Sequence, residues 1–411
     1  MPKDLPIALR RLNRWAPVFV HEVVEGLAGA GGKGYLVGGV VRDAFLGRRG
    51  ADWDVATDLT PDEVARAFPR IARTGEKHGT LLVIDEAGTS TVEVTTFRGE
   101  GPYLDGRRPS YVEFHQDVRE DLARRDFTMN AIAADLNTPE IVDPFGGVDD
   151  IRRKLIRCVG DPLARFSEDG LRPLRAARFA STLTFNVDGQ TEAALGEAMD
   201  VFEKVAWERK RVELEKLIVG PGLAKGIALL DRSGLLASMA PELSAAVPLS
   251  TLVELPKEPW LRMTAWGLSC GLTAGGLSEL ARRFKTSTAT RKQVEAWAAA
   301  SHSLPGPVEG AAFRHWLAGA GLLGAAGALE IFRARGGALA WYRKSKRKLR
   351  RPPPFRVADL AVGGADLQQL GIDGPKVGET LRALLRVVLD APSRNRREVL
   401  LKAAHTLSTD P

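Results

Sequence analysis

The chain has 411 residues, 44% of them hydrophobic and 27% charged, which suits two to four domains with ordinary buried cores. No run of about 18 apolar residues is present, so we expect no membrane span. The N-terminal segment lacks the apolar core of a signal peptide, which favours the cytoplasm. Cys158 and Cys270 are too few for a disulfide framework or a zinc cluster, and we expect both to be small buried residues.

The pattern of residues 1–155 predicts a small α+β domain of alternating short strands and helices. Glycine, proline and capping signals separate its elements. In chain order we expect a strand over 35–39 ending in a glycine turn, a short helix over 40–47, a strand over 51–57, a helix from Thr60 with a capping box to Glu63, and a hairpin of strands 80–86 and 90–97.

After Asp150 the strand signals fade, and stretches rich in Ala, Leu, Glu and Arg predict helices to the end of the chain. Glycine and proline predict breaks at 220–222, 246–259, 304–307 and 351–354. The net charge of +7 is concentrated at this end, because residues 341–411 hold 15 Lys and Arg against 7 Asp and Glu. A phosphate-rich partner could bind there, although a solvated basic surface explains the charge alone equally well.

Asp52 and Asp54 are the first candidate functional residues. They are separated by one residue on an expected strand, so both carboxylates should point to the same face. Magnesium is usually held by one or two carboxylates together with substrate phosphates. Glu93 lies on a later expected strand, with Thr91 and Thr95 on its face, and could be a third carboxylate near the metal.

Gly38 and Gly39 come shortly before these acids. They place bare backbone N–H groups at the start of a short helix, an arrangement that suits phosphate, and Arg42 follows on the same helix. Taken alone, the Asp-x-Asp pattern is most often a surface turn, and two glycines most often form a simple tight turn. The two glycines, the short helix and the Asp-x-Asp pattern follow one another along the chain, and this order favours a phosphate site over two unrelated turns.

Six motifs follow one another between residues 35 and 180. They are LVGGVVRDAFLG with DWDVAT, TGEKHGT, VEVTTFRGEG, RRDFTMNAIAAD, DPFGGVDDI and RFSEDGLRPLRAARFA. Together they closely resemble the class II tRNA nucleotidyltransferases, the CCA-adding enzymes, within the DNA polymerase β nucleotidyltransferase superfamily. A weaker likeness continues through WERKRVELEKL (207–217) and LGIDGPKVGETLRALLRVV (370–388), whereas residues 225–340 match only in being helical.

The resemblance implies a small mixed-sheet catalytic head followed by an all-helical neck, body and tail. We expect the head over 1–155, the neck with a nucleotide-selecting helix over 156–222, the body over 223–340 and a basic, tRNA-binding tail over 341–411. The implied reaction is attack of the tRNA 3′-hydroxyl on the α-phosphate of CTP or ATP with magnesium as cofactor.

The motifs also imply roles for individual residues. Asp52 and Asp54 would bind magnesium. The implied nucleotide-binding residues are Gly38, Gly39, Arg42, Arg124, Arg125, Asp126, Asn130, Asp169, Arg172, Arg175 and Arg178. The segment 97–114 resembles the flexible loop of the family, which is implied to help the change from C to A addition.

Base selection follows from hydrogen-bonding groups. We expect Ser167 to be a helix N-cap, with Asp169 in the first turn and Arg172 on the same helix face. An ionised Asp only accepts hydrogen bonds and Arg only donates them. Cytosine and adenine each present an amino donor beside a ring-nitrogen acceptor, which fits the pair. Uracil and guanine reverse this pattern, which explains their rejection without a template.

The basic tail is the expected contact with the RNA backbone. Its candidates are Arg343, Lys344, Lys346, Arg347 and Lys348, whereas Trp341 and Tyr342 are expected to be buried helix aromatics. Three related activities stay open: an A-adding enzyme, a CC-adding enzyme and, less favoured, a bacterial poly(A) polymerase. A non-catalytic RNA-binding protein is the alternative of another class. The sequence is compatible with a monomer or a dimer.

Overall fold

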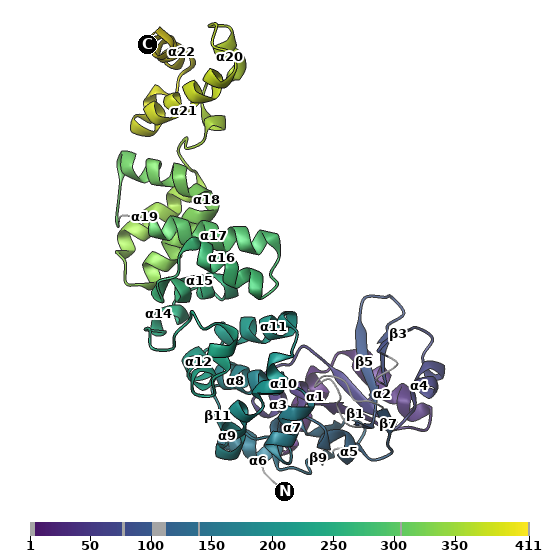
Figure 1. The fold of residues 1–411 in the computed structure, drawn as a ribbon. Helices are drawn as coiled ribbons and strands as arrows, with labels where there is room; N and C mark the ends of the chain where they lie inside the picture. The colour runs from purple at the N-terminus through teal and green to yellow at the C-terminus, as the bar shows by residue number, and fades with distance from the viewer. Residues whose placement is uncertain (1–4, 76–78, 101–111, 139, 305, 410–411) are drawn as a thin grey trace. The chain divides into compact units, whose positions relative to one another are not determined.

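The computed structural model describes residues 5–75, 79–100, 112–138, 140–304 and 306–409 (Figure 1). The chain divides into two compact units, Met1–Met239 and Ala240–Pro411. The division into a head, neck, body and tail stays a prediction. Most of the expected flexible loop, 101–111, lies outside the described residues, and its ends form strands β6 (Arg98–Glu100) and β7 (Val112–Phe114), which pair antiparallel.

A seven-stranded mixed sheet forms the first part of unit 1, in the order β3-β4-β5-β2-β1-β8-β9. β2 and β5 pair in parallel and the other neighbours are antiparallel. The strands are β1 (Gly34–Val37), β2 (Asp54–Thr57), β3 (Ile71–Gly75), β4 (Thr80–Ile84), β5 (Thr91–Thr96), β8 (Ala133–Asp135) and β9 (Ile141–Val142).

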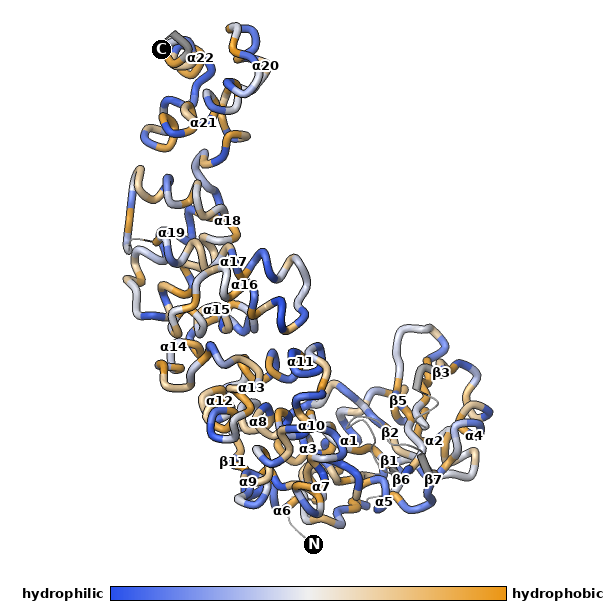
Figure 2. Tube along the Cα trace, in the orientation of Figure 1, coloured by the Kyte–Doolittle hydropathy of each residue, from blue (hydrophilic) through white to orange (hydrophobic). Residues whose placement is uncertain are grey.

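The helices of unit 1 form two groups. The first group lies in the same part of the chain as the sheet, and the second group forms the second part of the unit. The first group is α1 (Leu5–Trp15), α2 (Val18–Gly29), α3 (Gly39–Phe45), α4 (Pro61–Ala67) and α5 (Val118–Ala123). The second is α6 (Gly147–Arg153), α7 (Pro162–Glu168), α8 (Arg172–Leu183), α9 (Gly189–Glu197), α10 (Met199–Glu203), α11 (Trp207–Ile218), α12 (Leu223–Arg232) and α13 (Leu235–Met239). In Figure 2, α11 is largely hydrophilic.

The local signals of the head give the expected elements. Thr60 caps α4, and Glu63 closes the capping box. Gly88, with φ of +72°, turns the β4–β5 hairpin, and Gly47, with φ of +69°, follows α3. One boundary differs: β2 begins at Asp54, so Asp52 lies in the loop before the strand rather than on it.

The region after Asp150 is helical with one exception. β10 (Leu155–Ile156) and β11 (Asn186–Val187) pair in parallel, which joins the start of this region to the segment after α8. Sequence periodicity missed these strands because two residues are too few to show alternation. The breaks at 220–222, 304–307 and 351–354 separate helices as expected, whereas 246–259 contains the short helix α14 (Ser250–Val253).

Unit 2 consists of helices, and two of its apolar clusters lie in its later part. One core contains Phe313, Trp316, Leu317, Trp341 and Tyr342, and the other gathers residues 362–404. Besides α14, the described α-helices of unit 2 are α15 (Pro259–Ser269), α16 (Ala274–Arg283), α17 (Thr288–His302), α18 (Gly310–Ala334), α19 (Leu339–Arg350), α20 (Gly364–Gln368), α21 (Pro375–Asp390) and α22 (Arg397–Thr409).

α18 is the one described helix that is long and apolar enough to cross a membrane. Gly321 breaks its backbone geometry with φ of +65° and ψ of +169°. Residues on both sides of this break, including Phe313 and Leu329, are buried in the core of unit 2. A buried core helix meets the same length and composition criteria, and α18 has this character here.

Candidate active site

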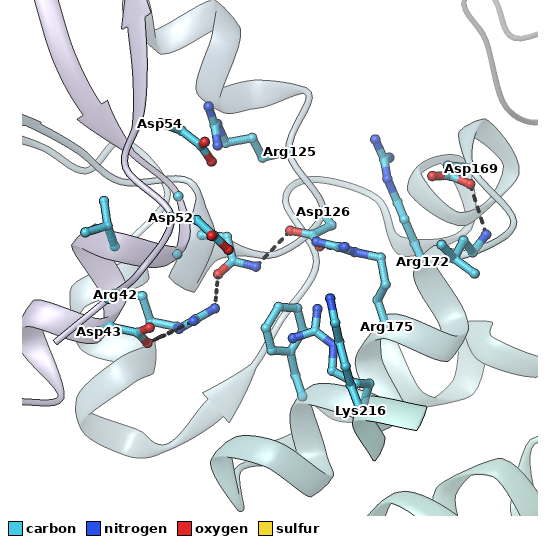
Figure 3. Close-up of a pocket in the computed structure, with 18 of the residues that line it drawn as sticks. Arg42, Asp43, Asp52, Asp54, Arg125, Asp126, Asp169, Arg172, Arg175 and Lys216 are labelled. Atoms are coloured by element: carbon cyan, nitrogen blue, oxygen red, sulfur yellow. Dashed lines mark hydrogen bonds and ion pairs between the residues drawn. The ribbon is translucent and has the colours of Figure 1, made fainter. Parts of the chain in front are cut away.

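A pocket of about 510 Å³ in unit 1 gathers most of the candidate residues (Figure 3). Five segments line it: the β1–α3 turn, the loop before β2, residues 124–130, the α7–α8 region and α11. Its charged side chains are eight cationic and five acidic, which suits an anionic ligand. They are Arg42, Arg124, Arg125, Arg172, Arg175, Arg178, Arg209 and Lys216, with Asp43, Asp52, Asp54, Asp126 and Asp169.

Asp52 and Asp54 both line this pocket, although only Asp54 belongs to β2. Across the described residues, no hydrogen bond or ion pair joins either carboxylate to a protein donor. Desolvation by the pocket walls raises the pKa of Asp54 above its usual value, the charge of Arg125 opposes this, and that of Asp52 adds to it. Two unpaired, mutually repelling carboxylates are a suitable donor set for a cation.

Glu93 lies near Asp54 because their two strands are paired in the same sheet. The parallel register of β2 and β5 places it directly beside Asp54. Burial raises the pKa of the Glu93 carboxyl, and the Asp54 charge raises it further. Within the described part of the chain, however, no three His, Cys, Asp or Glu residues are grouped closely enough to hold one ion. Glu93 is therefore a neighbour of Asp54 in the sheet, and its role at the metal stays a prediction.

The Gly38-Gly39 turn leaves space for two arginines. Gly38 has φ of +73° and ψ of −131°, a conformation that favours glycine. A Cβ atom on Gly38 would lie 3.0 Å from Nη1 of Arg125, and one on Gly39 would lie 3.6 Å from Nη2 of Arg42. The bare backbone therefore allows both guanidinium groups to approach the turn.

Arg42 is buried and oriented by two neighbours. Its Nε and Nη2 donate to Asp43 at 2.9 and 2.8 Å, and its Nη1 donates to the side chain of Asn130 at 2.8 Å. These bonds use three of its five N–H groups. The remaining two are available to a ligand in the pocket.

Arg125 has fewer hydrogen bonds to the protein than Arg42 has. Its Nη2 donates to the buried carboxylate of Asp121 at 3.0 Å, and Asp121 also binds Arg124. These two cations hold the pKa of Asp121 below its usual value despite its burial. Nε of Arg125 is buried without a hydrogen-bond partner. Because Arg125 lines the pocket, this donor is available to a ligand there.

Asp126 lines the pocket, and its carboxylate is already bound by protein donors. It accepts hydrogen bonds from the Phe127 backbone, from Asn130 and from Arg175. Although Asp126 is buried, the charge of Arg175 and these hydrogen bonds hold its pKa far below the usual value. Its carboxylate is thus saturated by protein donors and orients Asn130 and Arg175.

Arg178 is fixed on α8 by packing and charge. Its guanidinium lies 3.4 Å from the centre of the Phe179 ring, and its Nε donates to Glu213 on α11 at 2.8 Å. Arg175 lies 3.9 Å from the same Glu213 carboxylate. The α8 arginines are therefore held in place before any ligand binds.

The expected geometry of Asp169 and Arg172 was wrong. Ser167 is not an N-cap: it lies inside α7 and bonds back to the carbonyl of Leu163. Asp161 caps α7 instead, and α8 starts only at Arg172. Asp169 lies in the turn between the two helices, so the pair does not share a helix face. Both residues nevertheless line the pocket.

Arg172 is anchored by one edge of its guanidinium group. Nη1 donates to the Arg165 carbonyl and to Glu168, and Nη2 donates to the Arg124 carbonyl at 2.9 Å. This leaves the Nε–H and one Nη2–H, which share the opposite edge of the planar group. That edge can donate two parallel hydrogen bonds.

Arg209 and Lys216 are pocket residues that motif reading did not identify. Arg209 donates from Nη2 to Asp169 at 2.8 Å, while its buried Nη1 has no partner. Both residues lie in the segment WERKRVELEKL, which was noted only as a weak family likeness. Helical periodicity within that segment could not show which residues face the pocket, because the partner residue is 40 positions away.

The candidate RNA-binding residues on the basic helix α19 fall into two groups. Lys344 and Lys346 form ion pairs with Glu309 and Glu330, whereas Arg343 and Arg347 are exposed and have no ion pair with another described residue. Lys348 lies 4.8 Å from the centre of the Phe313 ring. Trp341 and Tyr342 are buried, as expected.

Comparison with known proteins agrees with this site. Residues 34–157 match the family model of the poly A polymerase head domain, and 184–247 match that of the probable RNA and SrmB-binding site of polymerase A. The CCA-adding enzyme of Geobacillus kaustophilus is 38% identical over 383 residues, which cover 92% of this chain and 93% of that protein. That of Geobacillus stearothermophilus is 37% identical over 92% and 93% of the two chains.

Among solved structures, the crystal structure of the Bacillus stearothermophilus CCA-adding enzyme in complex with CTP covers all of both chains, with a TM-score of 0.80 and 32% identity. The Thermotoga maritima CCA-adding enzyme complexed with tRNA has a TM-score of 0.68 at 21% identity over 95% of each chain, which supports the fold alone. The pocket, the mixed-sheet head and these similarities over nearly the whole chain lead to one assignment: the chain belongs to the family of CCA-adding enzymes.

Proposed function

We propose that this protein adds CCA to the 3′ end of tRNA in the cytoplasm, without a nucleic-acid template, using CTP and ATP and releasing pyrophosphate. One observation carries the proposal: a single pocket brings two unpaired carboxylates together with Asp169, Arg172 and a set of arginines. The two carboxylates suit metal-dependent phosphoryl transfer, and the Asp–Arg pair suits recognition of C and A.

Asp52 and Asp54 are the proposed magnesium ligands. Their freedom from protein donors and the raised pKa of Asp54 fit a bound cation. Magnesium bound there would lower the pKa of the attacking hydroxyl group and neutralise charge on the triphosphate. Glu93, beside Asp54 in the sheet, adds negative charge at the same position and strengthens the attraction for a cation.

The arginines at the β1–α3 turn would bind the triphosphate. Arg125 is the stronger candidate, because only one of its N–H groups has a protein partner in the described structure and its Nε is buried unpaired. Arg42 offers two further N–H groups from a fixed position. Asp126 and Asn130 would act beneath them by orienting Arg175 and Arg42.

Base choice would depend on the free groups of Asp169 and Arg172. The Asp169 carboxylate would accept from the amino group of cytosine or adenine. The free Nε and Nη2 of Arg172 would donate to N3 and O2 of cytosine, or to N1 of adenine. Uracil and guanine would face Asp169 with a carbonyl and Arg172 with an N–H, and each unmet polar group costs on the order of 1–3 kcal/mol.

The decisive experiment gives the purified protein three tRNA substrates, ending before CCA, after C and after CC. Labelled CTP and ATP are supplied separately and together. We expect two C additions followed by one A on the first substrate. Incorporation of A alone, and only on the CC-ended tRNA, would identify an A-adding enzyme, and arrest after two C residues a CC-adding enzyme.

The same experiment tests the remaining alternatives. Long A tracts on arbitrary RNA would identify a poly(A) polymerase, which shares the head-domain family model. Binding of tRNA without any incorporation in the presence of magnesium would identify a non-catalytic RNA-binding protein. The unpaired carboxylates of Asp52 and Asp54 favour an active enzyme over this last outcome.

A further inference from the structure

Four exposed arginines lie on unit 1 outside the active-site pocket. Arg10 and Arg14 are one helical turn apart on α1, and Arg48 and Arg49 lie in the loop between α3 and β2. We call these four residues the arginine patch. None of them has an ion pair within the described part of the chain.

Two hydrogen bonds hold the two segments of the patch together. Nη1 of Arg11 donates to the carbonyl of Ala44 in α3 at 2.9 Å, and Nη2 of Arg49 donates to the carbonyl of Trp15 in α1 at 3.4 Å. The guanidinium of Arg11 also lies 3.4 Å from the position of a Cβ on Gly47. α1 therefore packs beside α3 and the following loop (Figure 1).

The charge of the patch is not neutralised by its surroundings. α1 contains three arginines and no acidic residue. Of the nearby acids, Asp43 binds Arg42, and Asp135 accepts hydrogen bonds from its own turn, at Asn137 and Thr138. Asp43 is neutralised by Arg42, and the charge of Asp135 is outnumbered by the four arginines, so the patch presents net positive charge to a partner.

The loop part of the patch is adjacent along the chain to residues of the active site. The residues that follow Arg49 along the chain, Gly50, Ala51 and Asp52, line the catalytic pocket. On its other side, Arg10, Arg11 and Arg14 line a groove of about 800 Å³ against the segment 135–137. A ligand with regularly spaced phosphates could have one end in the catalytic pocket. Its following phosphates would then lie near these arginines.

We propose that the arginine patch binds the phosphate backbone of the RNA substrate next to its 3′ end. The inference rests on the proposed function and adds a second RNA-binding surface, separate from the basic tail. RNA is a better candidate than an anionic membrane, because Ala8 and Leu12 of α1 are at most 1% exposed and Ile7, at 40%, is the one exposed large hydrophobic side chain of this helix. Phosphate contacts of this kind would position the RNA without reading its sequence.

The test compares three double variants of equal charge. Arg10→Gln with Arg14→Gln changes α1, and Arg48→Gln with Arg49→Gln changes the loop. Arg66→Gln with Arg153→Gln is the control, since both of these arginines are exposed on unit 1 outside the patch. The dissociation constant of tRNA ending before CCA is measured between 50 and 200 mM KCl, together with KM for that tRNA and for CTP.

Each lost phosphate contact should reduce the slope of log K against log salt by about 0.7 to 0.9. We therefore expect each patch variant to lower the slope by about 1.5 and to raise KM for tRNA several-fold, with KM for CTP unchanged at saturating tRNA. The control should keep the wild-type slope.

Slopes equal to the control in both patch variants would overturn the inference. So would loss of binding to phosphatidylserine vesicles with an unchanged tRNA slope, because the patch would then serve a membrane surface. The binding measurement needs no nucleotide incorporation. Failure of the wild-type protein to add CCA would thus count against the proposed function alone.

Discussion

Arg209 on α11 fixes the carboxylate of Asp169 through a 2.8 Å hydrogen bond between residues 40 positions apart. The same turn is confined from another side, because a Cβ on Gly170 would lie 2.5 Å from the carbonyl oxygen of Val201. Asp169 is outside any helix, and its other oxygen accepts a hydrogen bond from the Leu171 N–H at 3.0 Å, so this local bond and the contact with Arg209 together set its direction. Arg209 is therefore a candidate positioning residue for base selection.

Replacing Arg209 by Ala should relax base selection. Without the guanidinium, Asp169 loses a charged partner, and discrimination against UTP should fall by about tenfold, the equivalent of one unmet hydrogen bond. The measurement is kcat/KM for CTP, ATP, UTP and GTP on tRNA. Arg209→Lys should restore part of the selection, because an ammonium group can still donate to Asp169.

Arg211→Ala is the matched control for this prediction. Arg211 lies on the same helix and pairs with Glu215, outside the pocket. It should leave base selection unchanged. If Asp169→Ala relaxes selection but Arg209→Ala does not, the positioning role is wrong while base reading by Asp169 stands.

Replacing both Asp52 and Asp54 by Asn should abolish incorporation while tRNA binding persists. The same change should raise the Tm of the protein in EDTA, because it removes the repulsion between two unpaired carboxylates. Magnesium should then raise the Tm of the wild type and not that of the variant. The measurement is thermal unfolding with and without magnesium, beside the incorporation assay. Retained incorporation would contradict the metal role of these residues.

Local chemistry made most of the head predictable. A capping box, a proline in the first helical turn and glycines at positive φ act within a few residues, and the elements around Thr60 and Gly88 formed as expected. The two-residue strands β10 and β11 could not be predicted in this way. They exist only because residues about 30 positions apart pair in space.

The candidate site was predictable in its composition but not in its geometry. Motifs identified Asp169 and Arg172, yet the expected shared helix face was wrong, because the chain turns between α7 and α8. The motif assigned Asp126 to the ligand, which stays a prediction, but it could not show that this carboxylate also binds Arg175 and Asn130. Arg209 was missed because its role depends on a distant partner.

Replacing Gly38 by Ala should weaken nucleotide binding in particular. A side chain at φ of +73° costs about 1–3 kcal/mol of stability, and the new Cβ would lie 3.0 Å from Nη1 of Arg125. We expect a higher KM for CTP and ATP with an unchanged dissociation constant for tRNA. Gly31→Ala is the control, since Gly31 has φ of +87° with no atom within 4 Å of the added Cβ. Equal KM changes in both variants would show that strain alone is responsible.

The exposed arginines of α19 should contribute more to tRNA binding than its lysines. Arg343 and Arg347 are free of ion pairs with other described residues, whereas Lys344 and Lys346 are held by Glu309 and Glu330. Arg343→Gln with Arg347→Gln should therefore reduce the salt dependence of tRNA binding by about 1.5 in slope. The lysine double variant removes the same charge and is its matched control. An equal loss in both would mean that the ion pairs open when RNA binds, and a loss in neither would place the tRNA elsewhere on the protein.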